Sequence, residues 1–218
     1  GKILWKHYTV SEEAMRAGFA GASVWGSSFP IDERSNTIFI GTGNNFIAPQ
    51  KYRDCLYEAK DDKAALEVCA KQYDFGDNYF DSILALDLDT GALKWGTKTT
   101  LYDSWNVSCG SRITIIPPKR DRVCPKPPGT DADFGQAPMF VRDVDVTIDG
   151  RATKTDVLVA AQKNGNVYLI NALEGRIIWK KFTGQGGDLG GHEWGSATDG
   201  KRIYLQTTNL EHDPVTFT

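Results

Sequence analysis

Residues 81–95 carry the feature that most constrains the fold of this chain: a short apolar run, a tight turn and a second short run that ends in Trp95. The stretch reads DSILALDLDTGALKW. Asp and Gly suit such a turn, because an Asp side chain accepts hydrogen bonds from the backbone that follows it and Gly adopts positive φ at little cost. We therefore predict a β-hairpin whose final tryptophan covers apolar surface of a neighbouring unit.

The same pattern recurs along the chain. Residues 167–179 read VYLINALEGRIIW, and residues 1–5 match the last five positions of the unit. A second pattern runs out of phase with the first: in residues 22–40 and again in 192–205, a Trp-Gly-Ser stretch precedes an aspartate-bearing turn and a strand-like run. Repeated units made only of strands and turns favour a radial β-propeller over a solenoid.

The repeat count sets the expected domain organisation. We predict an all-β fold in which residues 1–218 form about two and a half blades, with loop insertions at about 46–80 and 117–133. A closed propeller needs at least four blades, and an open arc would expose sheet edges. We expect this chain to be a piece of a longer polypeptide that supplies the remaining blades, with an independent open fold as the alternative. Helical character is expected only around residues 12–16 and 61–70.

The composition argues against nucleic acids as binding partners and against a membrane-spanning segment. The formal net charge is −3, which argues against general nucleic-acid binding, because that function usually needs a basic patch. No apolar run approaches the length of a membrane span.

Four cysteines lie outside the repeated strands. An even number of cysteines in loops predicts two disulfides, most simply Cys55–Cys69 and Cys109–Cys124, although four cysteines allow three pairings. The Cys-x-x-Cys spacing typical of zinc sites is absent. Asn106 begins an Asn-Val-Ser glycosylation sequon. These features predict a secreted or extracellular protein, or a periplasmic one in a bacterium.

Four short motifs stand out as candidates for a site. They are Trp25-Gly26, the Gly-Thr-Gly-Asn sequence that ends at Asn44, Asp103 between aromatic neighbours, and Lys163 within Gln-Lys-Asn-Gly. Each also has a purely structural interpretation: a plain glycine turn, an aspartate that caps a turn, or a lysine in a hairpin turn.

Together, in this order and at these spacings, the motifs resemble the quinoprotein alcohol dehydrogenase superfamily, whose eight-bladed propellers bind pyrroloquinoline quinone (PQQ). Within it the chain looks most like the polyvinyl-alcohol-dehydrogenase-like branch, and the resemblance covers nearly all of the chain.

The resemblance implies a role for each matching residue. Trp25 would stack beneath the quinone, Asn44 would supply an oxygen ligand to Ca²⁺, and Lys163 would contact the quinone carbonyls. Asp103 would be the general base that takes the alcohol proton, and would also lie at the metal. Glu193 and Trp194 occupy the place of a cofactor-facing Asn-Trp pair, from which Glu193 departs. A further calcium carboxylate is expected in a blade that this chain does not include.

The function that the resemblance implies is a secreted PQQ- and calcium-dependent alcohol dehydrogenase that oxidises primary, secondary or polymeric alcohols by hydride transfer to PQQ. The sequence leaves its electron acceptor open. The alternative is a non-enzymatic β-propeller that binds partners as a scaffold and keeps only a vestigial cofactor site, because fold does not fix function.

Overall fold

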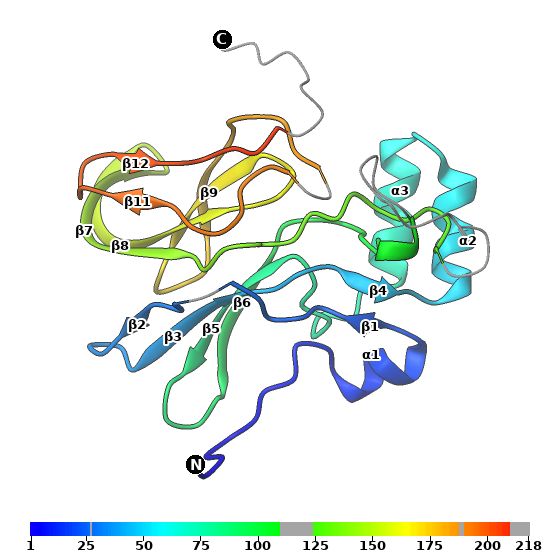
Figure 1. Cartoon of the computed structure of the whole chain (residues 1–218), viewed down its shortest axis with the longest axis horizontal. Coiled ribbons are helices and arrows are strands. Elements are labelled where there is room, and N and C mark those ends of the chain that lie inside the picture. Colours follow the sequence, from blue (N-terminus) through cyan, green and yellow to red (C-terminus); the bar gives the residue numbers. More distant parts are fainter. Residues whose placement is uncertain (27, 110–123, 188–189, 210–218) are drawn as a thin grey trace.

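The computed structural model describes residues 1–26, 28–109, 124–187 and 190–209. Two four-stranded antiparallel sheets dominate it (Figure 1), each with its strands side by side in sequence order. The first consists of β2 (Ile31–Asp32), β3 (Thr37–Gly41), β5 (Ser82–Asp87) and β6 (Leu93–Lys98). The second consists of β7 (Met139–Ile148), β8 (Arg151–Ala161), β9 (Asn166–Asn171) and β10 (Ile177–Phe182).

A further pair of strands, β11 (Ala197–Thr198) and β12 (Ile203–Tyr204), forms a separate two-stranded sheet beside the second. Successive antiparallel sheets of this kind are the blades of a propeller. The prediction of a partial β-propeller is therefore confirmed.

The main core lies between the two large sheets. Strand β5 is buried along nearly its whole length, as expected for an inner strand that is covered on both faces. Phe39 of β3 stacks on Phe140 of β7 with ring centroids 5.4 Å apart. This cluster joins the sheets through their facing side chains, among them Phe39, Ile83, Ala85, Phe134, Leu158, Tyr168 and Ile170.

Two of the tryptophans that end a hairpin unit, Trp5 and Trp95, dock on the turn of the next unit. The indole of Trp5 donates to the Leu88 carbonyl at 2.9 Å, and that of Trp95 donates to the Ala172 carbonyl at 3.1 Å. Gly91 and Gly175 have positive φ, and a Cβ at either position would overlap the docked indole ring. The predicted role of the trailing tryptophan is confirmed.

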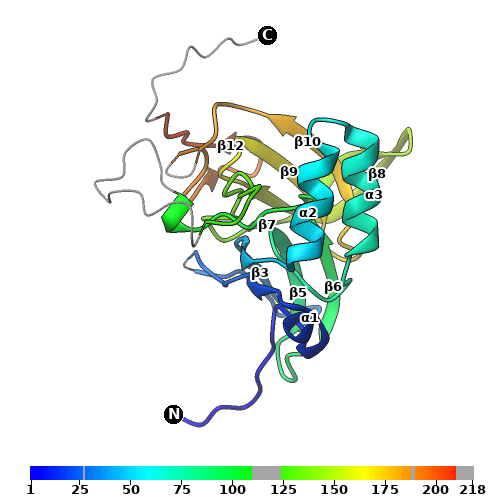
Figure 2. The same cartoon turned by 90° about the vertical axis from the view of Figure 1, so that its right-hand side faces the viewer.

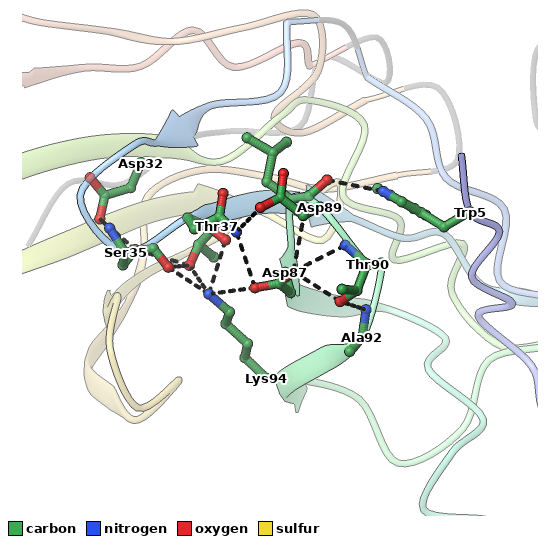
Figure 3. A network of polar contacts seen from close by, with 11 residues as sticks. Trp5, Asp32, Ser35, Thr37, Asp87, Asp89, Thr90, Ala92 and Lys94 are labelled. Carbon is green, nitrogen blue, oxygen red and sulfur yellow. Dashed lines mark hydrogen bonds and ion pairs between the residues drawn. The ribbon is translucent and has the colours of Figure 1, made fainter. Parts of the chain in front are cut away.

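In each of the turns on which a tryptophan docks, one side chain fixes the backbone conformation. Figure 3 shows the turn at Asp87. The carboxylate of Asp87 accepts hydrogen bonds from the backbone N–H of Asp89 at 3.2 Å and of Thr90 at 3.0 Å. In the next unit the Asn171 amide oxygen does the same for the two residues that follow Ala172. An Asp or Asn at this position is the turn chemistry from which the hairpins were predicted.

The first insertion contains the helix expected around residues 61–70, together with a second helix and a short strand that were not expected. It contains β4 (Asn45–Ile47), which pairs with β1 (Ala20–Gly21), and two helices, α2 (Gln50–Ala59) and α3 (Lys63–Gln72). These helices lie at one end of the sheets, with the short helix α1 (Glu12–Ala17) below them (Figures 1 and 2). The predicted disulfide Cys55–Cys69 joins α2 to α3.

In the second insertion, residues 110–123 lie outside the described residues. The described part, 124–133, has no helix or strand, as predicted, and the disulfide Cys109–Cys124 ties its start to a 3₁₀ turn at Val107–Cys109. Within the described residues, no helix is long and apolar enough to cross a membrane.

Candidate functional site

The predicted site residues meet where several loops come together. A Cβ at Gly43 would touch both the Trp25 indole nitrogen and Asp133, so the Trp25 and Gly-Thr-Gly-Asn motifs are in close contact. The Lys163 Nζ lies 5.5 Å from the centroid of the Trp25 ring and 5.9 Å from that of Trp105. Motifs that are far apart in the sequence therefore form one cluster.

Trp25 and Lys163 pair a half-buried aromatic face with a buried cation. Lys163 follows β8, and its side chain is only 3% exposed. Its backbone N–H donates to the Asp133 carbonyl at 2.9 Å, which fixes the turn before β9. A planar ring with a cation held at this distance is a typical cation–π arrangement.

Asn44 links three parts of the cluster. Its backbone N–H donates to Asp133 Oδ1 at 2.6 Å, and its side-chain Nδ2 donates to the Trp105 carbonyl at 2.6 Å. The same Nδ2 lies 3.4 Å from Asp103 Oδ1. The structure thus brings Asn44 and Asp103 together, as predicted.

Asp103 is almost completely buried, with 1% of its surface exposed. Its Oδ1 accepts the Trp105 N–H at 3.0 Å, and its Oδ2 accepts the Ala132 N–H at 2.7 Å. Burial raises the pKa of Asp103, although these two backbone hydrogen bonds oppose the rise.

Two functional candidates were missed at the sequence level. Asp131 Oδ2 lies 2.5 Å from Lys163 Nζ, and Asp133 Oδ2 lies 3.4 Å from the same atom. Both side chains are buried, although they lie within residues 117–133, the proline-rich stretch that was predicted to be a loop insertion. The sequence signal that could have identified these two residues is the Asp-Ala-Asp pattern just before the apolar Phe134.

Glu193 and Trp194 join the cluster at its edge. Glu193 Oε1 lies 3.8 Å from Lys163 Nζ. Trp194 meets Trp25 edge to face at 6.2 Å between ring centroids, but 78% of its surface is exposed.

Several acidic groups therefore share one lysine. Burial and the nearby Asp133 raise the pKa of Asp131 to about 8, even though Lys163 opposes this. Burial likewise raises the pKa of Glu193. Burial alone would lower the pKa of Lys163, but Asp131 and Asp133 outweigh it, so that pKa is raised. The ammonium form of Lys163 is thus favoured throughout the physiological range.

The metal part of the prediction is only partly matched. Asn44 presents its Nδ2, and not its oxygen, to Asp103 Oδ1, whereas Ca²⁺ takes six to eight oxygen ligands. Among the described residues, no group of three or more His, Cys, Asp or Glu side chains is arranged to hold a metal ion. These residues do not by themselves complete a calcium site.

Asn106, the predicted glycosylation site, lies close to this cluster. Its Oδ1 accepts the Ser108 N–H at 3.0 Å, and its Nδ2 donates to the Phe46 carbonyl at 3.3 Å. The sequon is therefore packed against the start of the first insertion.

The known proteins that this chain is similar to in sequence include alcohol dehydrogenases. The chain is 29% identical over 220 residues to the polyvinylalcohol dehydrogenase of Sphingopyxis sp. (strain 113P3), an alignment that covers 96% of this chain and 28% of that protein. It is 26% identical over 202 residues to the quinohemoprotein alcohol dehydrogenase ADH-IIG of Pseudomonas putida, covering 83% of this chain and 21% of that protein. These matches support a resemblance of this chain to the quinoprotein alcohol dehydrogenase superfamily.

The chain spans less than a third of the length of these relatives. No family model matches it. Among solved structures, it is similar to the quinohemoprotein alcohol dehydrogenase of Comamonas testosteroni, with a TM-score of 0.45 and 20% identity, covering 80% of this chain and 23% of that one.

Proposed function

We propose that the protein that contains this chain is a PQQ-dependent alcohol dehydrogenase, acting on primary, secondary or polymeric alcohols. The observation that carries this proposal is the cluster itself, in which the Lys163 ammonium lies 5.5 Å from the Trp25 ring centroid and buried carboxylates surround it. The names of the relatives, which are alcohol dehydrogenases, support the same activity.

Each residue of the cluster has a distinct task in this proposal. Trp25 offers a flat aromatic face on which a planar cofactor can stack. Lys163 stabilises negative charge that develops on nearby oxygens, because a preorganised cation in a buried site is worth more than one in water. PQQ, when bound, supplies the hydride acceptor that no side chain of the protein can provide.

A buried carboxylate takes the alcohol proton. The resemblance implies Asp103 as this base, but we assign the role to Asp131, whose Oδ2 lies against Lys163 Nζ. A raised pKa suits such a role, because a base with a pKa near the working pH accepts a proton most effectively. The pKa values of both residues are raised.

Calcium is the finer part of the proposal. Asn44 and Asp103 would contribute two oxygen ligands, and the other ligands would come from the remainder of the polypeptide or from the cofactor. The two disulfides and the sequon at Asn106 support a secreted or extracellular location, since disulfides persist in oxidising compartments. We leave the electron acceptor open.

The decisive experiment is a PQQ titration of the full-length protein with and without Ca²⁺, followed by tryptophan fluorescence. Saturable quenching at micromolar PQQ, together with dye-linked oxidation of alcohols, is expected. Calcium-dependent quenching would support the metal assignment, and quenching that survives chelation would contradict it. Absence of saturable quenching would contradict the enzyme and favour the alternative, a propeller scaffold with a vestigial site.

A further inference from the structure

Two chain segments that flank the second insertion meet at Asp103. Besides the disulfide Cys109–Cys124, several hydrogen bonds hold residues 102–109 against 124–133. The Ser104 N–H donates to the Pro128 carbonyl at 2.8 Å, and the Tyr102 hydroxyl donates to the Pro127 carbonyl at 2.6 Å. The segment that carries Asp131 and Asp133 is thus attached to its neighbour at several points.

The Asp103 carboxylate makes the attachment nearest to the site. Its Oδ2 accepts the N–H of Ala132, the residue between Asp131 and Asp133. Its Oδ1 accepts the N–H of Trp105 and faces the Asn44 amide. Three of the roughly four lone-pair positions of a carboxylate are therefore directed at neighbouring N–H groups.

Gly129 shows how closely the loop lies against this carboxylate. Its φ is +97°, and a Cβ built at this position would overlap Asp103 Oδ1 and lie 2.8 Å from the Asp103 Cα. Only glycine fits this approach without displacement.

We propose that Asp103 is a positioning residue, which holds residues 131–133 so that Asp131 meets the Lys163 ammonium. Asp133 is placed by the same contact, and it joins the Asn44 N–H on one side to Lys163 on the other. Loss of the Asp103 contact would free the backbone at Ala132 and loosen both acids. The catalytic consequence rests on the proposed function, whereas the structural consequence does not.

The test uses Asp103→Asn in the full-length protein. Asparagine has nearly the same shape, but its single carbonyl oxygen cannot serve both backbone donors. Asp32→Asn is the matched control, because Asp32 is also buried and accepts the backbone N–H groups of Arg34 and Ser35, yet lies at the end of β2.

Hydrogen exchange without cofactor gives the first measurement. We expect amides in residues 129–134 to exchange at least about tenfold faster in Asp103→Asn, which corresponds to the loss of one strong hydrogen bond, and to be unchanged in Asp32→Asn. Unchanged exchange in Asp103→Asn would overturn the proposal. If this variant does not fold, Gly129→Ala gives the same test, because it displaces the loop and leaves the carboxylate intact.

Steady-state kinetics with PQQ gives the second measurement. We expect Asp103→Asn to lower kcat by about 10- to 100-fold with the alcohol KM changed less than about threefold, and Asp131→Asn to lower kcat further. A loss beyond about 1000-fold in Asp103→Asn, with unchanged exchange, would show that Asp103 acts on the substrate directly. If the wild-type protein shows no PQQ-dependent oxidation, the proposed function fails, while the exchange result still decides the positioning role.

Discussion

The indole N–H of Trp95 donates to the backbone carbonyl of Ala172, 3.1 Å away in the hairpin turn of the next sheet. Trp5 makes the same bond to Leu88, one unit earlier in the chain. The repeated tryptophan therefore connects the sheet that carries it to the next sheet; this contact is called the joint below.

Removal of this joint is expected to destabilise the fold. Trp95→Ala should lower the free energy of unfolding by about 3 kcal/mol, because it removes a large packed ring as well as the hydrogen bond. Trp95→Phe should cost less, about 1 kcal/mol from the unpaired Ala172 carbonyl and the smaller ring. Urea denaturation checks both values. Trp194→Ala is the control, since that exposed side chain should contribute little, and an equal loss in all three variants would contradict the joint.

The glycine beneath each indole offers a separate test of the same contact. At Gly175 an added Cβ would lie 2.5 Å from the Trp95 ring, and φ is +73°. Gly200 has a similar φ of +83° with nothing within 4 Å. Gly200→Ala therefore reports the cost of the backbone conformation alone, about 1 kcal/mol, and Gly175→Ala should cost at least about 1 kcal/mol more. Equal losses of unfolding free energy would show that the ring can move aside.

The stability of the protein should depend on pH through Asp131. Its pKa is raised from 3.8 to about 8 in the folded protein. Between these values the folded state binds more protons than the unfolded state, so the free energy of unfolding should fall as the pH rises, by at most about 1.4 kcal/mol per pH unit. Urea unfolding from about pH 5 to pH 7 measures this slope. Asp131→Asn should reduce it, with a residual slope of the same sign from Glu193 and Asp103, and a slope identical to wild type would exclude Asp131 as its source.

The two disulfides allow a matched comparison between stability and activity. They close loops of nearly equal length, with sequence separations of 14 and 15 residues. Replacing either pair by serine should therefore cost about 3 kcal/mol of unfolding free energy. Only the loss of Cys109–Cys124 should lower kcat by more than about tenfold, because that bond ties together the segments that carry Asp103 and Asp131. Equal kcat values for the two double variants would contradict this distinction.

The repeated hairpins could be predicted from sequence because their determinants are local. Asp87 and Gly91 determine one turn through a side-chain hydrogen bond and a positive φ. Asp62 caps α3, so it indicates the start of that helix in the sequence. Helix α2 has no such signal: it begins after Pro49, which provides no side-chain cap, so its stability comes from packing Tyr52 and Leu56 against the rest of the protein.

The cluster around Lys163 was only half predictable for a related reason. Trp25, Asn44, Asp103 and Lys163 lie in short motifs whose combination can be recognised in the sequence, although each motif alone is also typical of a turn. Asp131 and Asp133 acquire their significance only because the segment that carries them passes between the two sheets, and nothing local in a proline-rich stretch indicates that route.

The forward docking of each indole also has a consequence during synthesis. Trp5 must wait for a carbonyl 83 residues further along the chain, and Trp95 for one 77 residues further. At about 5–20 residues per second, each indole stays without its partner for roughly 4–17 s after it is made. During synthesis each blade of this protein therefore exposes its unpaired indole. The rate of translation, rather than the folding rate of the blade itself, sets how long that indole is accessible to chaperones or to incorrect intermolecular contacts.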